Sequence, residues 1–368
     1  MELTNLTIKK VVKALGDTQG YVSPEMFGAV GNGVADDSAA FQSAINSGAP
    51  IRLQNKTYNV SNVDITIPTH IDMCGAKIQR AVEGGNIFVA RAALTLENGT
   101  LDGLNNSDGY SHVLLFDSAD SDLILTNMEF INNCYGYPTP VLSVNADLVD
   151  VQHVNRLIVT NCVFDVASRN GISVTESYNE VSIDRCKFTN CYLFGFDCEM
   201  NNPVADSCGD IKITNSVFIG NGRKNGSYVW NSGGSFQVSS PQHQDITFGK
   251  NVFVSGCTML TNDYAKVSGQ VSPYVCIEGV RDIWFVNNHV TSFDRVLIAR
   301  WHEAYKAFSA HVCGNTFDLH EGGPQESHPY IQSVEHAIVS DNYFGAGYNI
   351  SADNKYESNN VHIWSYTP

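Results

Sequence analysis

The segment LIVTNCVF at residues 157–164 returns in related form at 181–188 (VSIDRCKF) and at 211–218 (IKITNSVF). Each copy alternates apolar and polar residues, as half-buried strands do, and then ends in a small or polar residue, one variable residue and Phe. The steps of 24 to 37 residues between such endings indicate loops of different length inserted between constant strands. The last residues of these endings form one series: Phe130, Phe164, Phe188, Phe218, Phe253, Val290, Phe317 and Phe344.

This repeat predicts an all-β solenoid, a right-handed parallel β-helix. Helical solenoids are excluded because no helical pattern separates the strands, and neither a leucine-rich frame nor a four-stranded propeller blade is present. The Phe series should form a buried column. We expect the residues two positions earlier to stack at a tight turn, where Asn tolerates a left-handed φ and its amide bonds to the next Asn. These residues are Met128, Cys162, Cys186, Ser216, Asn251, Asn288, Asn315 and Asn342.

The front of the chain differs from the repeat. Asp36 or Asp37 is expected to N-cap a short helix, which would close the open end of the solenoid with an apolar stripe of Ala40, Phe41, Ala44 and Ile45. We divide the chain into an N-terminal attachment or oligomerisation segment (1–22), an N-terminal cap (23–50), the parallel β-helix (51–345) and C-terminal strands that close it (346–368).

Composition restricts the partners. The net charge of −16 makes nucleic acid an unlikely ligand, since a phosphate-tracking surface would oppose the overall field. No apolar run reaches the roughly 18 residues of a membrane span, and the start lacks the features of a signal peptide, so we expect a soluble chain made in a cytoplasm. The ten cysteines form no CxxC pair, which favours buried reduced thiols. Residues His302 and Glu303 do not complete a zinc motif, so neither a metal nor a cofactor is predicted.

Two stretches carry a resemblance to a known family. FGAVGNGVADDSAAFQSAIN (27–46), followed by NKTYNVSN (55–62), resembles the N-terminal signature of the pectate lyase superfamily. RNGISV (169–174) and GFDCEM (195–200) are similar to successive coils of such β-helices, although Met200 departs from the usual Pro. The resemblance implies a polysaccharide depolymerase of the phage tailspike type, located in the virion and synthesised in the host cytoplasm. It further implies a homotrimer, with phage tail or baseplate proteins as partners of the N-terminus.

An acidic pair is the candidate catalytic site. In GFDCEM, alternation places Phe196 and Cys198 on one face of a strand and Asp197 and Glu199 on the other. Their Cα atoms should lie roughly 6.5 to 7 Å apart, and carboxyl groups about 6.5 to 9.5 Å apart suit an inverting glycosidase. Side-chain rotamers leave the stereochemical outcome open.

The pair should lie in a polar stripe. Aligning Gly171 with Gly195 stacks Ser173 beside Asp197, with Asp150 in the same column one coil earlier. Stacked acids raise one another's pKa, which an acid catalyst near neutral pH requires. Arg169 could orient a sugar carboxylate or hold an enzyme carboxylate ionised, and an exposed Trp could stack on a sugar ring. The candidate substrate-binding residues are Arg169, Asp150, Glu176, Gln237, Glu278, Trp230 and Trp301.

Three functions fit this pattern. The leading hypothesis is cleavage of a bacterial surface polysaccharide by acid/base hydrolysis at Asp197 and Glu199. A second is a glycan-binding or structural tail protein without catalysis. A third is β-elimination, in which Arg169 or a Tyr would act as the base.

The segment Glu2 to Leu15 predicts a trimer, because its apolar residues have no core of their own to cover them. Light scattering on the full-length chain should give about three times the monomer mass. A mass near 40.3 kDa at micromolar concentration would exclude the trimer.

Overall fold

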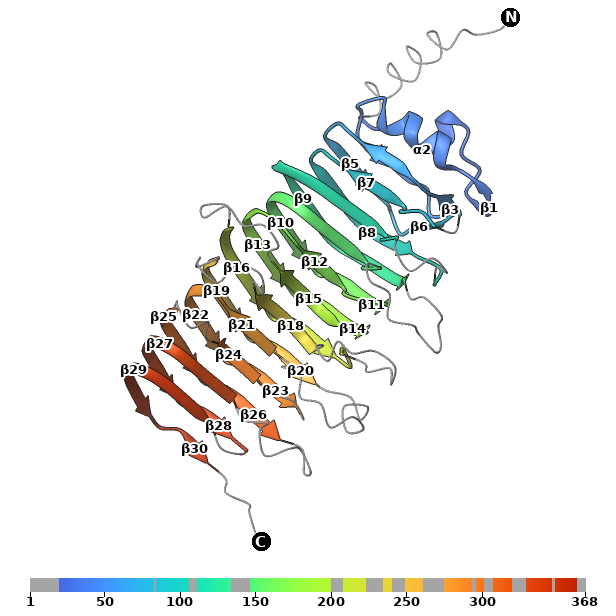
Figure 1. The fold of residues 1–368 in the computed structure, drawn as a ribbon. Helices are drawn as coiled ribbons and strands as arrows, with labels where there is room; N and C mark the ends of the chain where they lie inside the picture. Colours follow the sequence, from blue (N-terminus) through green and yellow to red (C-terminus); the bar gives the residue numbers. More distant parts are fainter. Residues whose placement is uncertain are drawn as a thin grey trace, which may run out of the picture.

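The computed structural model describes residues 20–82, 84–105, 111–133, 146–199, 208–222, 234–239, 249–260, 275–292, 296–300, 307–319, 329–345 and 348–362. Within these residues, thirty strands pair in parallel into one continuous sheet that winds into a stack of coils. The stack runs from α2 (Ser38–Ile45) at one end to β30 (Val361–His362) at the other (Figure 1). The predicted right-handed parallel β-helix is confirmed.

Each coil passes through three columns of paired strands, which we call faces 1, 2 and 3 in chain order. The longest strands bend around a corner and serve two or more faces. Face 1 contains β4 (Val63–Ile65), β7 (Phe88–Ala90), β9 (Leu114–Asn133), β10 (Val149–Thr160), β12 (Ile172–Val174), β15 (Phe194–Glu199), β18 (Gly234–Ser239), β21 (Val275–Glu278), β24 (Val296–Arg300), β27 (Pro329–Ser340) and β29 (Asn349–Ser358).

Faces 2 and 3 hold the remaining strands, together with later parts of β9, β10, β27 and β29. Face 2 adds β2 (Ile51–Arg52), β5 (Thr69–Asp72), β8 (Leu94–Asp102), β13 (Tyr178–Asp184), β16 (Cys208–Thr214), β19 (Gly249–Ser255), β22 (Val280–Val286) and β25 (Ala307–Cys313). Face 3 adds β1 (Asn32–Asp36), β3 (Thr57–Val60), β6 (Lys77–Arg80), β11 (Val163–Ala167), β14 (Lys187–Cys191), β17 (Val217–Ile219), β20 (Thr258–Leu260), β23 (His289–Ser292), β26 (Thr316–Leu319), β28 (Tyr343–Phe344) and β30.

The predicted Phe column lies at the centre of the core, on face 3. Phe164 stacks on Phe130 and Phe188 with ring centroids 5.1 and 4.8 Å apart, and Phe188 stacks on Phe218 at 4.8 Å. The rings are nearly parallel because in-register parallel strands repeat the same rotamer from coil to coil. Each such contact adds about 0.5–1.5 kcal/mol to the burial of the rings.

One member of the series was predicted wrongly. Met259, not Phe253, continues the column, since Met259 pairs with Phe218 and Val290. Phe253 pairs with Lys212 and lies on face 2, pointing away from the core. The residues KNVF match the pattern of a strand ending but lie within β19. The corner between faces 2 and 3 follows at Gly256.

The corner between faces 2 and 3 carries the second predicted column, with two corrections. Cys257 replaces Asn251 in it, and the left-handed φ belongs to the residue before the column, as at Asn161 (φ 54°), Asn287 (φ 55°) and Gly256 (φ 66°). The column residues themselves are buried, and the asparagines among them are hydrogen-bonded from coil to coil. The tight turn therefore needs two adjacent residues: the first adopts the left-handed φ, and the second is buried in the column.

Asparagine amides form the C-terminal half of this column. Asn315 Nδ2 donates to Phe285 O at 2.8 Å and to Asn342 Oδ1 at 2.9 Å. Its Oδ1 accepts the backbone N–H of Asn288 at 2.9 Å. Asn342 repeats the pattern with Asn360. The stacked amides satisfy the corner's backbone groups away from water.

The described cysteines remain thiols. All nine of them are free, and seven are buried. Cys162 and Cys186 adjoin one another in the corner column, as predicted, and hydrogen bonding to Cys186 together with burial raises the pKa of the Cys162 thiol. The thiol form is thereby favoured at that position.

The N-terminal helix covers the first coil. Its predicted stripe is buried, and the Phe41 ring lies 5.3 Å from Tyr58 and 6.4 Å from Phe88. Asp37 occupies the N-cap position, but its carboxylate turns away and accepts the N–H of Val30 at 2.6 Å. Residues 1–19 lie outside the described residues, so the attachment segment and the four-part division stay predictions.

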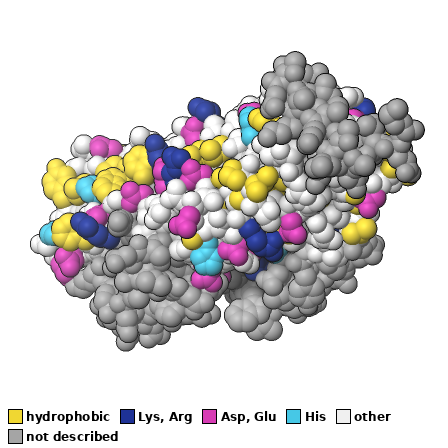
Figure 2. Space-filling model, turned by 90° about the horizontal axis from the view of Figure 1, so that it is seen from above, with side chains coloured by type: hydrophobic (Ala, Val, Ile, Leu, Met, Phe, Trp, Pro, Cys, Tyr) yellow, Lys and Arg dark blue, Asp and Glu magenta, His cyan; other side chains and the backbone are white. Residues whose placement is uncertain are grey.

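Uncharged side chains and backbone cover much of the described surface that Figure 2 shows. On the face seen in Figure 2, Lys and Arg of the described residues occur in small groups beside Asp and Glu, and do not form a continuous basic track. Among the described residues, neither the 3-10 helix η1 (Pro24–Phe27) nor α2 combines the length and the hydrophobicity that crossing a membrane requires.

The asparagine column predicts a stability effect. Asn315→Ala should lower the free energy of unfolding by about 2–4 kcal/mol, because it removes several buried hydrogen bonds and leaves their partners unsatisfied. Urea denaturation followed by circular dichroism measures this loss. Asn349→Ala is the matched control, since that side chain is exposed on β29, and equal midpoints for both variants would contradict the role of the column.

Candidate active site

The predicted polar column is present on face 1. Asp150 pairs with Ser173 across β10 and β12, and Ser173 pairs with Asp197 across β12 and β15. Asp197 in turn pairs with Gln237 of β18. Neighbouring parallel strands lie about 4.8 Å apart, so Asp150 and Asp197 are separated by about 10 Å at Cα.

Two glycines bring these strands close to the Phe column. A Cβ on Gly171 would lie 2.5 Å from Gly195 O, and one on Gly195 would lie 2.8 Å from both Phe188 Cβ and Phe218 Cδ1. Glycine is therefore required where β12 and β15 begin. In β15, Phe196 and Cys198 then enter the core, while Asp197 and Glu199 project from the other side of the sheet.

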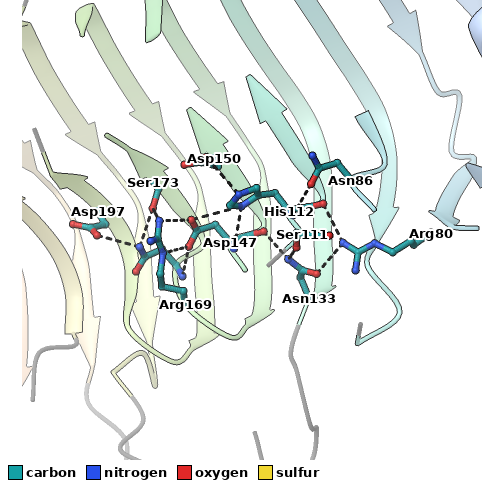
Figure 3. Close-up of polar contacts among 11 residues, drawn as sticks. Arg80, Asn86, Ser111, His112, Asn133, Asp147, Asp150, Arg169, Ser173 and Asp197 are labelled. Carbon is teal, nitrogen blue, oxygen red and sulfur yellow. Dashed lines mark hydrogen bonds and ion pairs between the residues drawn. The ribbon is translucent and has the colours of Figure 1, made fainter. Parts of the chain in front are cut away.

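A buried ion pair supports the column (Figure 3). Arg169 binds Asp147 in a bidentate manner, with Nε to Oδ1 at 2.8 Å and Nη2 to Oδ2 at 2.6 Å. The same Nη2 donates to Ser173 Oγ at 3.0 Å. Asp147 is fully buried, so this guanidinium neutralises a carboxylate that water cannot reach.

Asn170 connects the ion pair to Asp197. Its Nδ2 donates to Ser173 Oγ at 2.8 Å and to Asp197 Oδ2 at 3.0 Å. The other oxygen of Asp197, Oδ1, is buried and accepts no hydrogen bond from the described residues. Asp197 is 4% exposed, whereas Glu199 is half-buried. Asp197 is thus less accessible than the surface acid that alternation alone suggests.

His112 lies beside the other acid of the column. Its Nε2 is 3.5 Å from Asp150 Oδ2, and its Nδ1 is 3.8 Å from Asp147 Oδ2. Asp150 is 5% exposed, and its Oδ1 also accepts no hydrogen bond within the described part of the chain.

The environment shifts the titration of these groups. Burial, reinforced by the charge of Glu199, raises the pKa of Asp197 to about 8. Burial also raises the pKa of Glu199 and of Asp150, although Arg169 opposes the first shift and His112 the second. Burial disfavours the charged form of Arg169, but Asp147 overcomes this and raises its pKa above the ordinary value. At neutral pH Asp197 is mostly protonated and Arg169 is a permanent cation.

Three of the other predicted binding residues lie on or next to the strands of face 1. Gln237 is half-buried beside Asp197, Glu176 follows the end of β12, and Glu278 ends β21 in line with Ser239. Arg169 is bonded to a carboxylate of the protein, Asp147, and its predicted role in substrate binding stays a prediction. Trp230 and Trp301 lie outside the described residues.

Sequence reasoning missed three residues of the site: His112, Asp147 and Asn170. They stack at the corner between faces 3 and 1, where the N–H of each coil donates to a side chain of the coil before it. Asp147 N donates to His112 Nδ1 at 3.4 Å, and Asn170 N donates to Asp147 Oδ1 at 2.8 Å. Each of the three lies two residues before the first paired residue of its strand, which is the signal that alignment of the strands would have provided.

Within the described residues, no cluster of three or more ligating side chains is placed to hold a metal ion.

Comparisons with known proteins show the fold. No protein-family model matches the chain, and no curated protein sequence does. The solved structures that resemble it include ORF18 of Geobacillus virus E2 (TM-score 0.54, 14% identity) and tailspike protein 2 of Escherichia coli O157:H7 bacteriophage CAB120 (TM-score 0.56, 13% identity). A third is the N-terminal fragment of gene product 12 of bacteriophage Phi29 (TM-score 0.52, 15% identity).

These similarities extend over most of the chain. They cover 98%, 88% and 93% of it, in the same order, but 66%, 42% and 68% of the three longer proteins. The chain therefore has the parallel β-helix found in phage tailspikes and related phage proteins, and it spans about two thirds or less of their length.

The Arg169–Asp147 pair predicts a large stability effect. Asp147→Asn should lower the free energy of unfolding by about 3–5 kcal/mol, because it leaves Arg169, whose side chain is only 20% exposed, without its counter-charge. Thermal or urea unfolding measures the change. Asp64→Asn is the matched control: it breaks an exposed Asp64–Arg91 pair with 56% and 54% exposed side chains, so its cost should stay below about 1 kcal/mol. Equal losses in the two variants would refute a structural role for the buried pair.

Proposed function

We propose that the chain is a tailspike-like depolymerase that cleaves a bacterial surface polysaccharide by acid/base glycoside hydrolysis. The observation that carries the proposal is that one strand presents a buried carboxyl with a raised pKa, Asp197, and a half-buried one, Glu199. Two carboxyl groups in different environments are what this reaction requires. The fold shared with tailspike protein 2 supports a glycan target and a place in a virion tail.

The two acids have different roles: Asp197 is the general acid and Glu199 is the general base. Asp197, with its pKa near 8, donates a proton to the glycosidic oxygen as the carbon–oxygen bond breaks. Glu199 accepts a proton from the water that attacks the anomeric carbon, and it later returns this proton to solvent. The Cα separation of roughly 7 Å between residues two apart on a strand is compatible with the spacing of about 6.5 to 9.5 Å between carboxyl groups that admits such a water. Asn170 orients Asp197 through its bond to Oδ2, so that Oδ1 can carry the transferred proton.

The environment of Arg169 weighs against its use as the base of a β-elimination. A base must lose its proton, and Asp147 stabilises the protonated guanidinium through two hydrogen bonds. Elimination by another base is distinguished by its product, an unsaturated sugar that absorbs near 235 nm.

A second candidate is glycan binding without catalysis. It is favoured by the 4% exposure of Asp197, since an acid this buried could serve only to hold Asn170 in place through its Oδ2. Incubation with capsular and lipopolysaccharide preparations separates the functions. New reducing ends support hydrolysis, absorbance near 235 nm supports elimination, and retention without new ends supports binding alone.

The acid/base assignment predicts a pH profile. Activity should fall as pH rises through about 8, because Asp197 loses the proton that it must donate. It should also fall at low pH, where Glu199, whose pKa is raised, takes up a proton and stops acting as a base. Asp197→Asn and Glu199→Gln should each reduce kcat by roughly 10²- to 10⁴-fold, measured as release of reducing ends.

Both variants are isosteric, and Asn at position 197 can still accept the bond from Asn170. Asp120→Asn is the control, because Asp120 is an exposed acid of β9. Full turnover by either active-site variant would show that the catalytic residues lie elsewhere.

A further inference from the structure

The outer surface of face 2 carries an uncharged, partly aromatic stripe in its C-terminal half. On the successive strands β19, β22, β25, β27 and β29, two neighbouring outward columns contain no Lys, Arg, Asp or Glu. We call these two columns the outer stripe. The first column is Phe253, Trp284, His311, Ile338 and Tyr356, and the second is Ser255, Val286, Cys313, Ser340 and Ser358.

The fold does not require these side chains. Inward residues of the same strands, such as Val254 and Phe285, are buried and fill the core without them. In the same two columns, the preceding strands β8, β9, β10, β13 and β16 carry no aromatic residue and include Glu97, Asp184 and Lys212. The change to an uncharged aromatic surface at β19 is therefore not explained by the packing of the core.

Aromatic rings in and beside the outer stripe are accessible. Tyr356 is 62% exposed, and Phe308, which lies on β25 three residues before His311, is 48% exposed. The Phe308 ring meets His336 edge-on with centroids 5.3 Å apart, and Trp284 stacks on His311 at 5.5 Å. An exposed apolar patch with polar side chains around it is typical of an interaction site.

The size and charge of the outer stripe restrict what it can hold. Four strand spacings and two columns give a strip about 20 Å long and about 10 Å wide, on the order of 200 Å². Each partner of a stable protein pair buries roughly 800 Å², and two copies that each carry a charge of −16 repel one another. A narrow ligand that lies along the stack fits the strip better than a second copy does. Covering the stripe desolvates no carboxylate, ammonium or guanidinium, which suits an uncharged ligand.

We propose that the outer stripe binds an uncharged glycan chain lying along the stack, as a second binding surface separate from the acids of face 1. A sugar ring has an apolar C–H face and a rim of hydroxyl groups. The exposed rings of Tyr356 and Phe308 contact the apolar face, and the hydroxyls of Ser340 and Ser358 bond to the rim. This binding does not depend on the hydrolysis proposed for face 1.

Neutral hexasaccharides of glucose, mannose, galactose and N-acetylglucosamine test the proposal. Calorimetric titration with each of them gives the affinity and stoichiometry for the wild-type chain and for the double variant Phe308→Ala/Tyr356→Ala. We expect at least one hexasaccharide to bind to the wild-type chain. The double variant should bind it roughly 5- to 100-fold more weakly, as the loss of two contacts of the strength of an aromatic pair implies.

Two controls accompany the double variant. Val34→Ala removes an apolar side chain that is 82% exposed on β1, far from the outer stripe in the stack, and should leave the affinity unchanged. Phe308→Leu/Tyr356→Leu keeps apolar bulk but removes both rings, and it should weaken binding as the alanine variant does. Because both side chains are exposed, the unfolding midpoints of all three variants should stay near that of the wild-type chain.

The inference is wrong if none of the hexasaccharides binds, or if every one that binds keeps its affinity and stoichiometry in both double variants. A smaller mass of the alanine variant in light scattering, without sugar binding by the wild-type chain, would instead assign the outer stripe to contacts between copies. The proposed hydrolysis fails separately. A chain that binds a neutral glycan through the outer stripe but releases no reducing ends from any polysaccharide would reject catalysis and retain this second binding surface.

Discussion

The stacking of equivalent side chains on successive coils is the constraint on which the rest of this structure depends. Each coil of a solenoid contacts only its neighbouring coils, so every coil must match the one below in register. Phe164 between Phe130 and Phe188, and Asn315 between Asn288 and Asn342, provide that match in the core and at one corner. Because both columns repeat over many coils, an insertion within a coil is tolerated only between the faces.

The candidate site uses the same device at a different corner. Where faces 3 and 1 meet, His112, Asp147 and Asn170 accept backbone N–H groups as the asparagines do elsewhere. Here, however, the acceptors include a carboxylate and an imidazole, and Asp147 requires Arg169 to neutralise it. The asparagine column at the other corner stabilises the fold without charged groups. The column of His112, Asp147 and Asn170 includes a charged group, and its Asn170 contacts Asp197. Stability and the titration of the candidate acid are coupled through these few contacts.

The register of the strands was predicted correctly from the sequence, whereas the details of the turns were not. Alternation and the glycines at 171 and 195 were sufficient to align Asp150, Ser173 and Asp197, because register in a parallel ladder follows directly from the apolar pattern. The same reasoning misplaced Phe253, since KNVF inside β19 matches the motif and only the position of the turn at Gly256 distinguishes the two. It also assigned the left-handed φ to the wrong one of two adjacent turn residues.

The amino-acid sequence by itself therefore determined the architecture, the core column and the strand on which Asp197 and Glu199 lie, because all of these follow from periodicity within short segments. Tertiary structure alone decided that Asp197 is buried, that Arg169 is bound to Asp147, and that His112 lies beside Asp150. These contacts join residues 22 to 38 positions apart across coils of unequal length. Burial and electrostatic environment depend on which side chains meet across those coils. A pattern within a short segment does not specify which residue of the next coil a side chain will contact.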